Sequence, residues 1–136
     1  MPGLIAAILD SRLTSLLGRV LLTFMFWSSG ISKVVDWKGG VADMVHFHLN
    51  PPGAFNLATL VVQLVGSALV IFGPYAWLGA GMLAVFTVLT IPIAHPFWTL
   101  QGPQRMNDMY TAVEHVSIVG ALMLVSVLRR REQAAR

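Results

Sequence analysis

The sequence contains no cysteine and very little charge. None of its 136 residues is Cys, and Asp, Glu, Lys and Arg together make up 11% of them, whereas soluble domains contain about 25% charged residues. The absence of Cys excludes a structural disulfide, a thiol relay and an iron–sulfur cluster held by this chain alone. Because 56% of the residues are hydrophobic, we predict an integral membrane protein and not a soluble domain. The first ten residues hold no Lys or Arg, so we expect no cleavable signal peptide.

The longest interval without charge lies in the middle of the chain. Between Asp43 and Arg105, roughly sixty residues contain no Asp, Glu, Lys or Arg, which is enough for two bilayer crossings at about 20 residues each. Together with the apolar runs before and after it, this interval predicts four transmembrane helices in one domain over residues 1–136. We place these helices at about residues 13–34, 55–72, 78–94 and 111–128, with polar loops at 35–54 and 95–110. Short connections favour an all-α, antiparallel four-helix bundle.

The basic residues predict how the bundle is oriented. Four crossings put both termini on one side, and that side holds most of the Lys and Arg residues: Arg12, Arg19, Arg129, Arg130, Arg131 and Arg136. The other side holds Lys33, Lys38 and Arg105. Because cytoplasmic segments carry the excess of basic residues, we predict that both termini are cytoplasmic. The basic cluster at the C-terminus adjoins an apolar segment, which indicates membrane topology and anionic lipid; we expect no nucleic-acid partner.

With this topology the remaining polar residues gather on the non-cytoplasmic side, including all four histidines: His46, His48, His95 and His115. Lys33 and Glu114 come closest to membrane depth, where an ionisable group indicates function. We predict that Lys33 pairs with Glu114, with His95 or His115 beside them. Such a pocket could bind a quinone headgroup, because a quinone carbonyl needs a hydrogen-bond donor and its reduction takes up protons. The candidate ligand-binding residues are Lys33, Gln63, His95, Glu114 and His115.

Structural roles compete with these functional ones. His46, His48 and Asp43 also fit plain loop positions, and Gln63 fits an amide that joins two helices by a hydrogen bond. His46 and His48 would point to one side only in an extended segment, and no spacing matches a metal site, so we expect no metal. A haem between His95 and His115 is a weaker alternative to quinone. No nucleophile constellation, phosphate loop or dinucleotide fingerprint is present, so catalytic residues remain unknown and enzymatic activity is left open.

Three stretches carry a family resemblance: F-W-S-S-G-I-S-K-V-V-D (26–36), Q-L-V-G-S-A-L-V-I-F-G (63–73) and H-P-F-W (95–98), the last followed by E-H-V-S-I-V-G (114–120). In this order, over about Arg19 to Val125, they resemble the DoxX family of small four-helix bacterial membrane proteins. Many members have Glu in place of Gln63 and a polar pair such as Lys-Asn in place of Glu114-His115. The resemblance implies a location in the bacterial inner membrane, and it links the chain to thiosulfate:quinone oxidoreduction, quinone stress and oxidative-stress enzymes.

Two functional hypotheses follow. The first is a membrane subunit or accessory of a quinone-linked redox or oxidative-stress system, with a polar pocket near the non-cytoplasmic interface. The alternative is a non-catalytic membrane anchor or scaffold for partner proteins; a small transporter ranks third. Besides the lipid bilayer, the expected partners are a quinone and either a redox enzyme or a second copy of the chain. The first hypothesis requires Lys33, His95 and Glu114 to converge.

Overall fold

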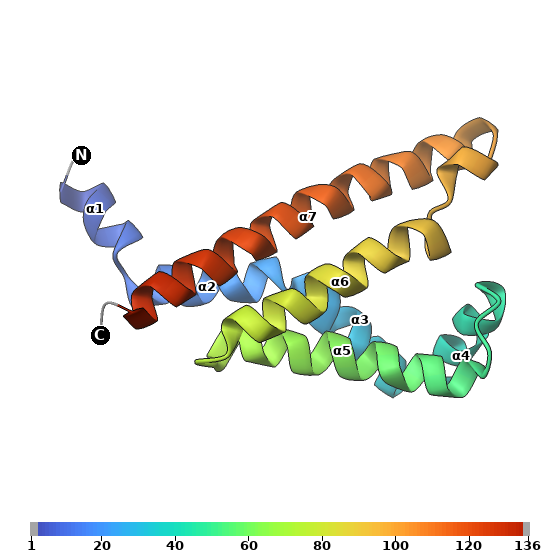
Figure 1. The fold of residues 1–136 in the computed structure, drawn as a ribbon, viewed down its shortest axis with the longest axis horizontal. Coiled ribbons are helices and arrows are strands. Elements are labelled where there is room, and N and C mark those ends of the chain that lie inside the picture. The colour runs from blue at the N-terminus through green and yellow to red at the C-terminus, as the bar shows by residue number, and fades with distance from the viewer. Residues whose placement is uncertain (1–2, 135–136) are drawn as a thin grey trace.

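The computed structural model describes residues 3–134, and within them the chain is helical and contains no strand. The elements are α1 (Gly3–Leu9), α2 (Arg12–Leu22), α3 (Phe24–Val35), α4 (Trp37–His46), α5 (Pro52–Phe72), α6 (Ala76–Ala94), the short 3-10 helix η1 (Phe97–Thr99) and α7 (Gly102–Ala134) (Figure 1). Helices α5, α6 and α7 are long and apolar enough to cross a membrane. This confirms the predicted all-α membrane architecture.

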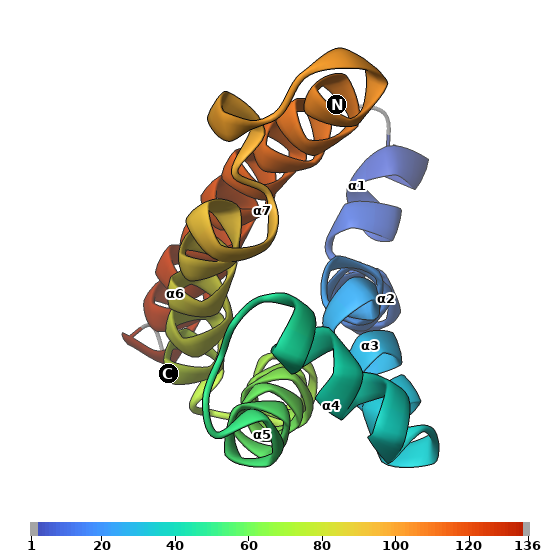
Figure 2. The same cartoon turned by 90° about the vertical axis from the view of Figure 1, so that its right-hand side faces the viewer.

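The long helices pack as neighbours in chain order. Helix α3 packs on α5, α5 on α6, and α6 on α7, while α2 contacts both α5 and α7. Helix α4 folds back over the start of α5 at one end of the molecule, and α1 lies at the opposite end (Figures 1 and 2). The chain therefore has one end that carries α1 and the end of α7, and another that carries α4 and η1.

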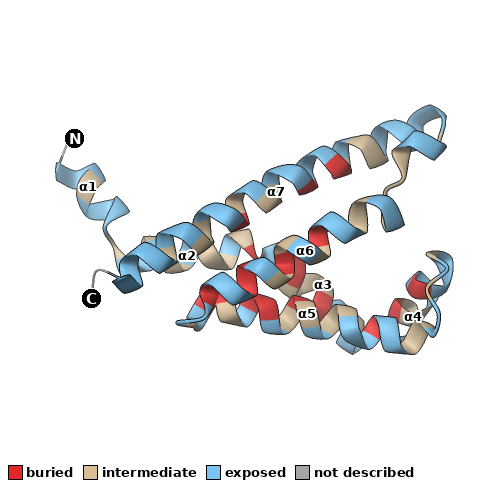
Figure 3. Ribbon diagram, in the orientation of Figure 1, coloured by how far each residue is buried: buried red, intermediate tan, exposed pale blue. Residues whose placement is uncertain are grey.

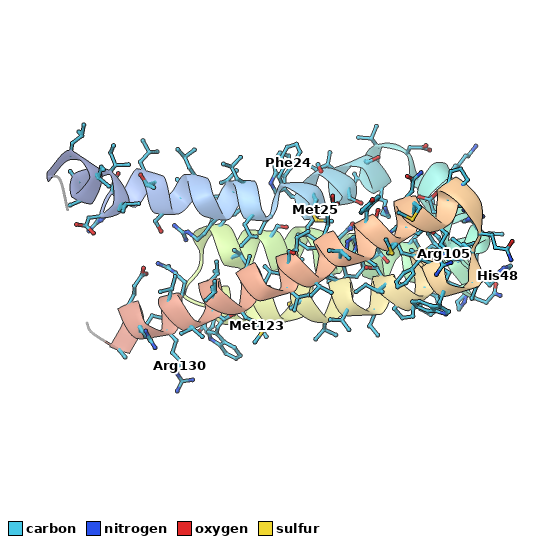
Figure 4. All side chains as sticks on the ribbon, turned by 90° about the horizontal axis from the view of Figure 1, so that it is seen from above. Phe24, Met25, His48, Arg105, Met123 and Arg130 are labelled. Atoms are coloured by element: carbon cyan, nitrogen blue, oxygen red, sulfur yellow. The ribbon has the colours of Figure 1, made fainter. Side chains whose placement is uncertain are left out.

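The first predicted crossing is divided into two helices. Helices α2 and α3 follow one another end to end and meet at Thr23 (Figure 4). The Thr23 hydroxyl donates to the Arg19 carbonyl oxygen at 2.8 Å, and a hydroxyl that bonds the preceding turn bends a helix. The backbone ladder nevertheless continues, because the Trp27 N–H donates to the Thr23 carbonyl at 3.1 Å. Thr23, Phe26 and Gly30 are buried, so the face of α2 and α3 that carries them points into the protein.

The core lies where α3, α5, α6 and α7 meet. Its buried apolar side chains are Phe26, Val70, Ala80, Leu83 and Leu122 (Figure 3). Two glycines let α5 and α6 approach closely: a Cβ on Gly79 would lie 2.6 Å from the Gly66 carbonyl oxygen. Small residues at a helix contact are typical of membrane proteins, in which close backbone approach supplies the packing energy.

The two connections at the α4 end are more helical than predicted. Residues 95–110 were expected to be a polar loop, but η1 and the first turns of α7 occupy most of that range. Gly102, at a φ of 65°, starts α7, and Pro103 fits its first turn because a helix start needs no N–H donor there. The prediction of a loop rested on the polarity of residues 95–110, and it is wrong for most of that range. In the other connection, Asp36 caps α4 by accepting the Gly39 N–H at 2.9 Å.

Candidate functional site

A cavity of about 460 Å³ opens between α3, α4, α5 and α6, at the end away from α1. Its walls are largely apolar and include Phe26, Phe55 and Phe86. Sites for small molecules have volumes of about 300–1,000 Å³ and combine apolar walls with a few polar groups. We call this the histidine cavity, because His95 and His115 both line it.

Helix α4 covers one side of the histidine cavity because of one close contact. Gly40 of α4 faces Asn56 of α5, and a Cβ on Gly40 would lie 2.5 Å from Asn56 Oδ1. Asn56 is fully buried. Only a glycine at this position lets α4 lie so close to α5, and with α4 in that position Met44 and Phe47 line the cavity.

Ser29 joins two of the predicted residues on one wall of the cavity. Lys33 Nζ and Gln63 Nε2 each donate to Ser29 Oγ at 3.2 Å. Ser29 precedes Lys33 by one helical turn, so both point from the same face of α3. Gln63 Oε1 is buried and has no hydrogen-bond partner within residues 3–134. This wall therefore presents ammonium donors and one free amide oxygen.

The two histidines meet on another wall. His95 follows the last residue of α6 and His115 lies in α7, and their rings are 5.2 Å apart between centroids with an interplanar angle of 74°. His95 Nδ1 lies 3.6 Å from Asp108 Oδ1, beyond ordinary hydrogen-bond distance. The Nδ1 atoms of both histidines are buried without a hydrogen-bond partner in the described part of the chain. Imidazole nitrogens placed in this way can accept or donate a proton.

Glu114 does not belong to this arrangement. Its side chain is exposed and does not line the cavity, whereas the adjacent His115 is buried and does. Neighbouring residues of an α-helix project about 100° apart, so only one of the two can face the cavity. Within residues 3–134, Lys33 forms no ion pair with Glu114 and donates to Ser29 instead. The predicted convergence of Lys33, His95 and Glu114 is therefore wrong for Glu114, whereas Lys33, His95 and His115 all line the histidine cavity.

Some cavity residues were not among the candidates. Asp43, interpreted from the sequence as a plain loop residue, lies in α4 and lines the cavity, as do Ser29 and Thr87. The spacing of one helical turn to Lys33 could have identified Ser29. No local signal could have identified Asp43, since it reaches the cavity only because α4 folds back. His46 and His48 are exposed and are not lining residues.

The described residues offer no metal site: between positions 3 and 134, no three His, Cys, Asp or Glu side chains are grouped as a metal ion would require. A haem between His95 and His115 also does not fit their geometry. Their ring centroids are only 5.2 Å apart, and a macrocycle placed between two axial imidazoles would need a wider separation.

Comparison with known proteins adds two findings. The profile of a family described as DoxX matches residues 14–96, which is more than half of the chain. The chain is also 23% identical over 112 residues to the inner membrane protein YphA of Escherichia coli (strain K12), and this match covers 82% of the chain and 80% of that protein. No solved structure matches the chain. The profile includes Lys33, Gln63 and His95 but ends before α7, so His115 lies outside it.

Proposed function

The chain belongs to the DoxX family and is a multi-pass protein of the bacterial inner membrane, and from this premise we propose that its histidine cavity binds a quinone headgroup for a redox partner. Family membership and location agree with the resemblance and the localisation predicted from the sequence. The proposal concerns what the cavity binds and which protein uses it.

One observation supports the proposal above all: the cavity combines apolar walls with polar atoms that lack protein partners. Gln63 Oε1 and the Nδ1 atoms of His95 and His115 are buried and unpaired in the described part of the chain. Leaving such an atom unpaired costs about 1–3 kcal/mol. A ligand that forms hydrogen bonds with these atoms would recover part of that free energy. A quinone has a flat apolar ring with an acceptor oxygen at each end, which can accept from Lys33 Nζ on one wall and from an imidazole N–H on the other, whereas Gln63 Oε1 can only accept from the hydroxyl groups of the reduced form.

Each lining residue then has a chemical task. Lys33 Nζ, which donates one hydrogen bond to Ser29, keeps further donors for a carbonyl oxygen of the quinone. Quinone reduction adds two electrons and two protons, and the resulting hydroxyl groups would donate to His Nδ1 or to Gln63 Oε1. Asp108, close to His95, connects this histidine to the polar end of α7. The electrons would come from a partner enzyme, because no redox-active cysteine is present.

We also propose the membrane topology that gives the cavity its access. Helices α2 and α3 together would form a fourth crossing, since neither is long enough alone. The resulting single-domain, antiparallel four-helix bundle would have both termini in the cytoplasm, in agreement with the distribution of Lys and Arg. The histidine cavity would then open near the periplasmic interface. Cysteines introduced singly at Asn107 and Gln133 test this: a membrane-impermeant maleimide should label intact spheroplasts at position 107 and not at position 133.

Quinone binding is tested on purified protein. The protein is extracted from its own membrane in mild detergent, quinone is quantified by mass spectrometry, and decylubiquinone is titrated while tryptophan fluorescence is followed. We expect bound quinone in the wild type and at least about tenfold weaker decylubiquinone binding in His115→Phe, since one lost hydrogen bond to a buried group is worth about 1–3 kcal/mol. Glu114→Gln, a change at the neighbouring exposed position, is the matched control. Equal binding by both variants would contradict the proposal.

A scaffold role is the second candidate, favoured by the surface of α7. Only 17% of the apolar window of α7 is buried within the chain, compared with 33% for α5. Its exposed residues include Val116, Met123 and Leu124, and they can face lipid, a partner protein or a second copy. Crosslinking from position 123 in native membranes distinguishes these. A defined protein adduct together with an absence of bound quinone would favour the scaffold.

A further inference from the structure

A second cavity, of about 720 Å³, lies at the opposite end of the molecule from the histidine cavity. It is formed between the start of α2 and the end of α7, and it is rich in arginine. The lining residues that matter here are Ser11, Arg12, Ser15, Arg19, Arg129 and Glu132. We call it the arginine cavity. Neither the family match nor the related protein assigns it a role.

Two of its arginines are held in place by backbone carbonyls. Arg19 Nη1 donates to the Ile71 carbonyl at 2.6 Å, and Arg129 Nη2 reaches the Gly73 carbonyl at 3.5 Å. Both carbonyls belong to the end of α5, where the last carbonyls have no partner within the helix. The arginines therefore fix the geometry of the cavity while other guanidinium groups remain available.

Donors for an anion remain after these bonds are counted. Arg12 is exposed and makes no side-chain hydrogen bond or ion pair within residues 3–134. Arg129 contributes positive charge and no free donor, because its Nη atoms bond Glu132 and the Gly73 carbonyl and its Nε is buried. Of the two carboxylates at the cavity, Glu132 is already bound to Arg129 at 2.6 Å, which leaves Asp10. The local excess of guanidinium groups favours an anion, and a phosphate group accepts bidentate hydrogen bonds from arginine.

The surroundings indicate where that phosphate comes from. The cavity adjoins exposed apolar side chains of α1 and α2: Leu9 is 59% exposed, Leu13 63% and Leu17 51%. A soluble ligand gains nothing from such a surface, whereas the acyl chains of a lipid would cover it. The cavity also lies at the end of the apolar part of α7, just beyond Leu128, which corresponds to headgroup depth. Basic pockets between helices at this level bind anionic headgroups.

We propose that the arginine cavity binds the phosphate headgroup of an anionic phospholipid from the leaflet on the side of the termini. Arg12 contacts the phosphate, Arg129 beside it adds positive charge, and the acyl chains lie along the outer face of α2. Binding would fasten the start of α2 to the end of α7. This inference is independent of quinone binding at the other end.

The test uses the full-length protein, purified and delipidated in mild detergent. Native mass spectrometry follows binding of dioleoylphosphatidylglycerol, of dioleoylphosphatidylcholine and of inorganic phosphate. We expect one tightly bound phosphatidylglycerol, binding of phosphatidylcholine weaker by about tenfold or more, and no displacement by inorganic phosphate. Both lipids carry an anionic phosphodiester, so the expected difference comes from the choline cation of phosphatidylcholine, which the excess of guanidinium groups repels.

Matched variants separate a specific site from general attraction to positive charge. Arg12→Gln and Arg130→Gln each remove one positive charge, but Arg130 points away from α1 and α2 (Figure 4). Arg12→Gln should weaken phosphatidylglycerol binding about tenfold, and Arg130→Gln by less than about twofold. Arg12 has no tertiary bond within the described residues, so folding is not at risk.

A second pair of variants fills the cavity without changing charge. Ser15→Trp should abolish phosphatidylglycerol binding, whereas Met123→Trp, at an exposed position of α7 outside the lining, should not. Equal binding by Arg12→Gln and Arg130→Gln, or full binding by Ser15→Trp, would overturn the proposal. Displacement of the lipid by inorganic phosphate would assign the site to a soluble phosphate and would also overturn it.

Discussion

At the end of the molecule that carries α1, arginine side chains are bonded to backbone carbonyls, whereas at the opposite end histidine and glutamine atoms lie in a cavity without protein partners. Arg19 and Arg129 reach the carbonyls of Ile71 and Gly73, and Gln133 reaches that of Pro74. In the histidine cavity, by contrast, Gln63 and both histidines retain unpaired atoms, whereas Arg129 leaves only its Nε unpaired and bonds through both Nη atoms.

The difference separates two uses of polar residues in a membrane protein. A helix that ends inside the bilayer boundary leaves carbonyls without donors, and long arginine side chains satisfy them at little cost because their charge still reaches water. Polar atoms in the apolar cavity have no such compensation within residues 3–134, so they reduce stability. The polar contacts at the arginine end therefore stabilise the fold, whereas the unpaired atoms of the histidine cavity reduce stability. Loss of a polar group should cost more stability at the arginine end than in the histidine cavity.

The largest effect is expected at the arginine end. Arg19→Met should lower the free energy of unfolding by about 2 kcal/mol, because it removes a charge-assisted hydrogen bond to the end of α5. Unfolding by SDS in mixed micelles, followed by circular dichroism, measures it. Arg130→Met is the control of equal charge and should change stability by no more than about 0.5 kcal/mol. Equal losses would show that general charge, and not the carbonyl contact, stabilises this end.

The next effect concerns the contact that places α4 over the histidine cavity. Gly40→Ala should lower stability by about 1–2 kcal/mol, because the new Cβ overlaps the buried Asn56 side chain. Gly53→Ala, in a helix position with open space around it, should leave stability unchanged or raise it by up to about 1 kcal/mol. The same unfolding experiment compares the two. A stabilising Gly40→Ala would show that α4 is free to move away from α5.

A smaller effect on stability is expected inside the histidine cavity. Gln63→Leu removes the unpaired Oε1 and also the hydrogen bond to Ser29. These changes nearly cancel, so stability should stay within about 1 kcal/mol of the wild type. Binding of decylubiquinone should nevertheless weaken, which a fluorescence titration measures. A loss of stability as large as that of Arg19→Met would remove the contrast between the two ends.

The smallest effect is expected at Glu114. Glu114→Gln should leave both stability and quinone binding unchanged, within about 0.5 kcal/mol, because the side chain is exposed.

Asp108→Asn, on the same helix but close to His95, should alter the pH dependence of decylubiquinone binding. Measuring binding between pH 5 and pH 8, the range in which histidine titrates, tests both variants. A change in Glu114→Gln alone would return Glu114 to the site.

Much of the site was predictable because helical spacing is a local property. Lys33, Gln63, His95 and His115 were all candidates, and the structure places each of them at the histidine cavity. Glu114 was also a candidate, and the sequence offered no way to choose between it and His115. That choice depends on the rotation of α7 about its axis, which is set by its packing on α6. Until this packing is known, the sequence gives no reason to prefer Glu114 or His115 as the residue that faces the cavity.

By itself the sequence determined that the protein lies in a membrane, is helical and belongs to the DoxX family. The length of the apolar runs and their lack of charge decide membrane insertion, and the short motifs identify the family. Only the tertiary structure decided the return of α4 over α5 and the contacts between the arginines and the carbonyls at the C-terminal end of α5. These features depend on pairs of residues far apart in the chain, and a pattern read along one helix contains no information about which helix it will meet. The same reason explains why Asp43 reached the cavity unpredicted and why the arginine cavity was visible only after folding.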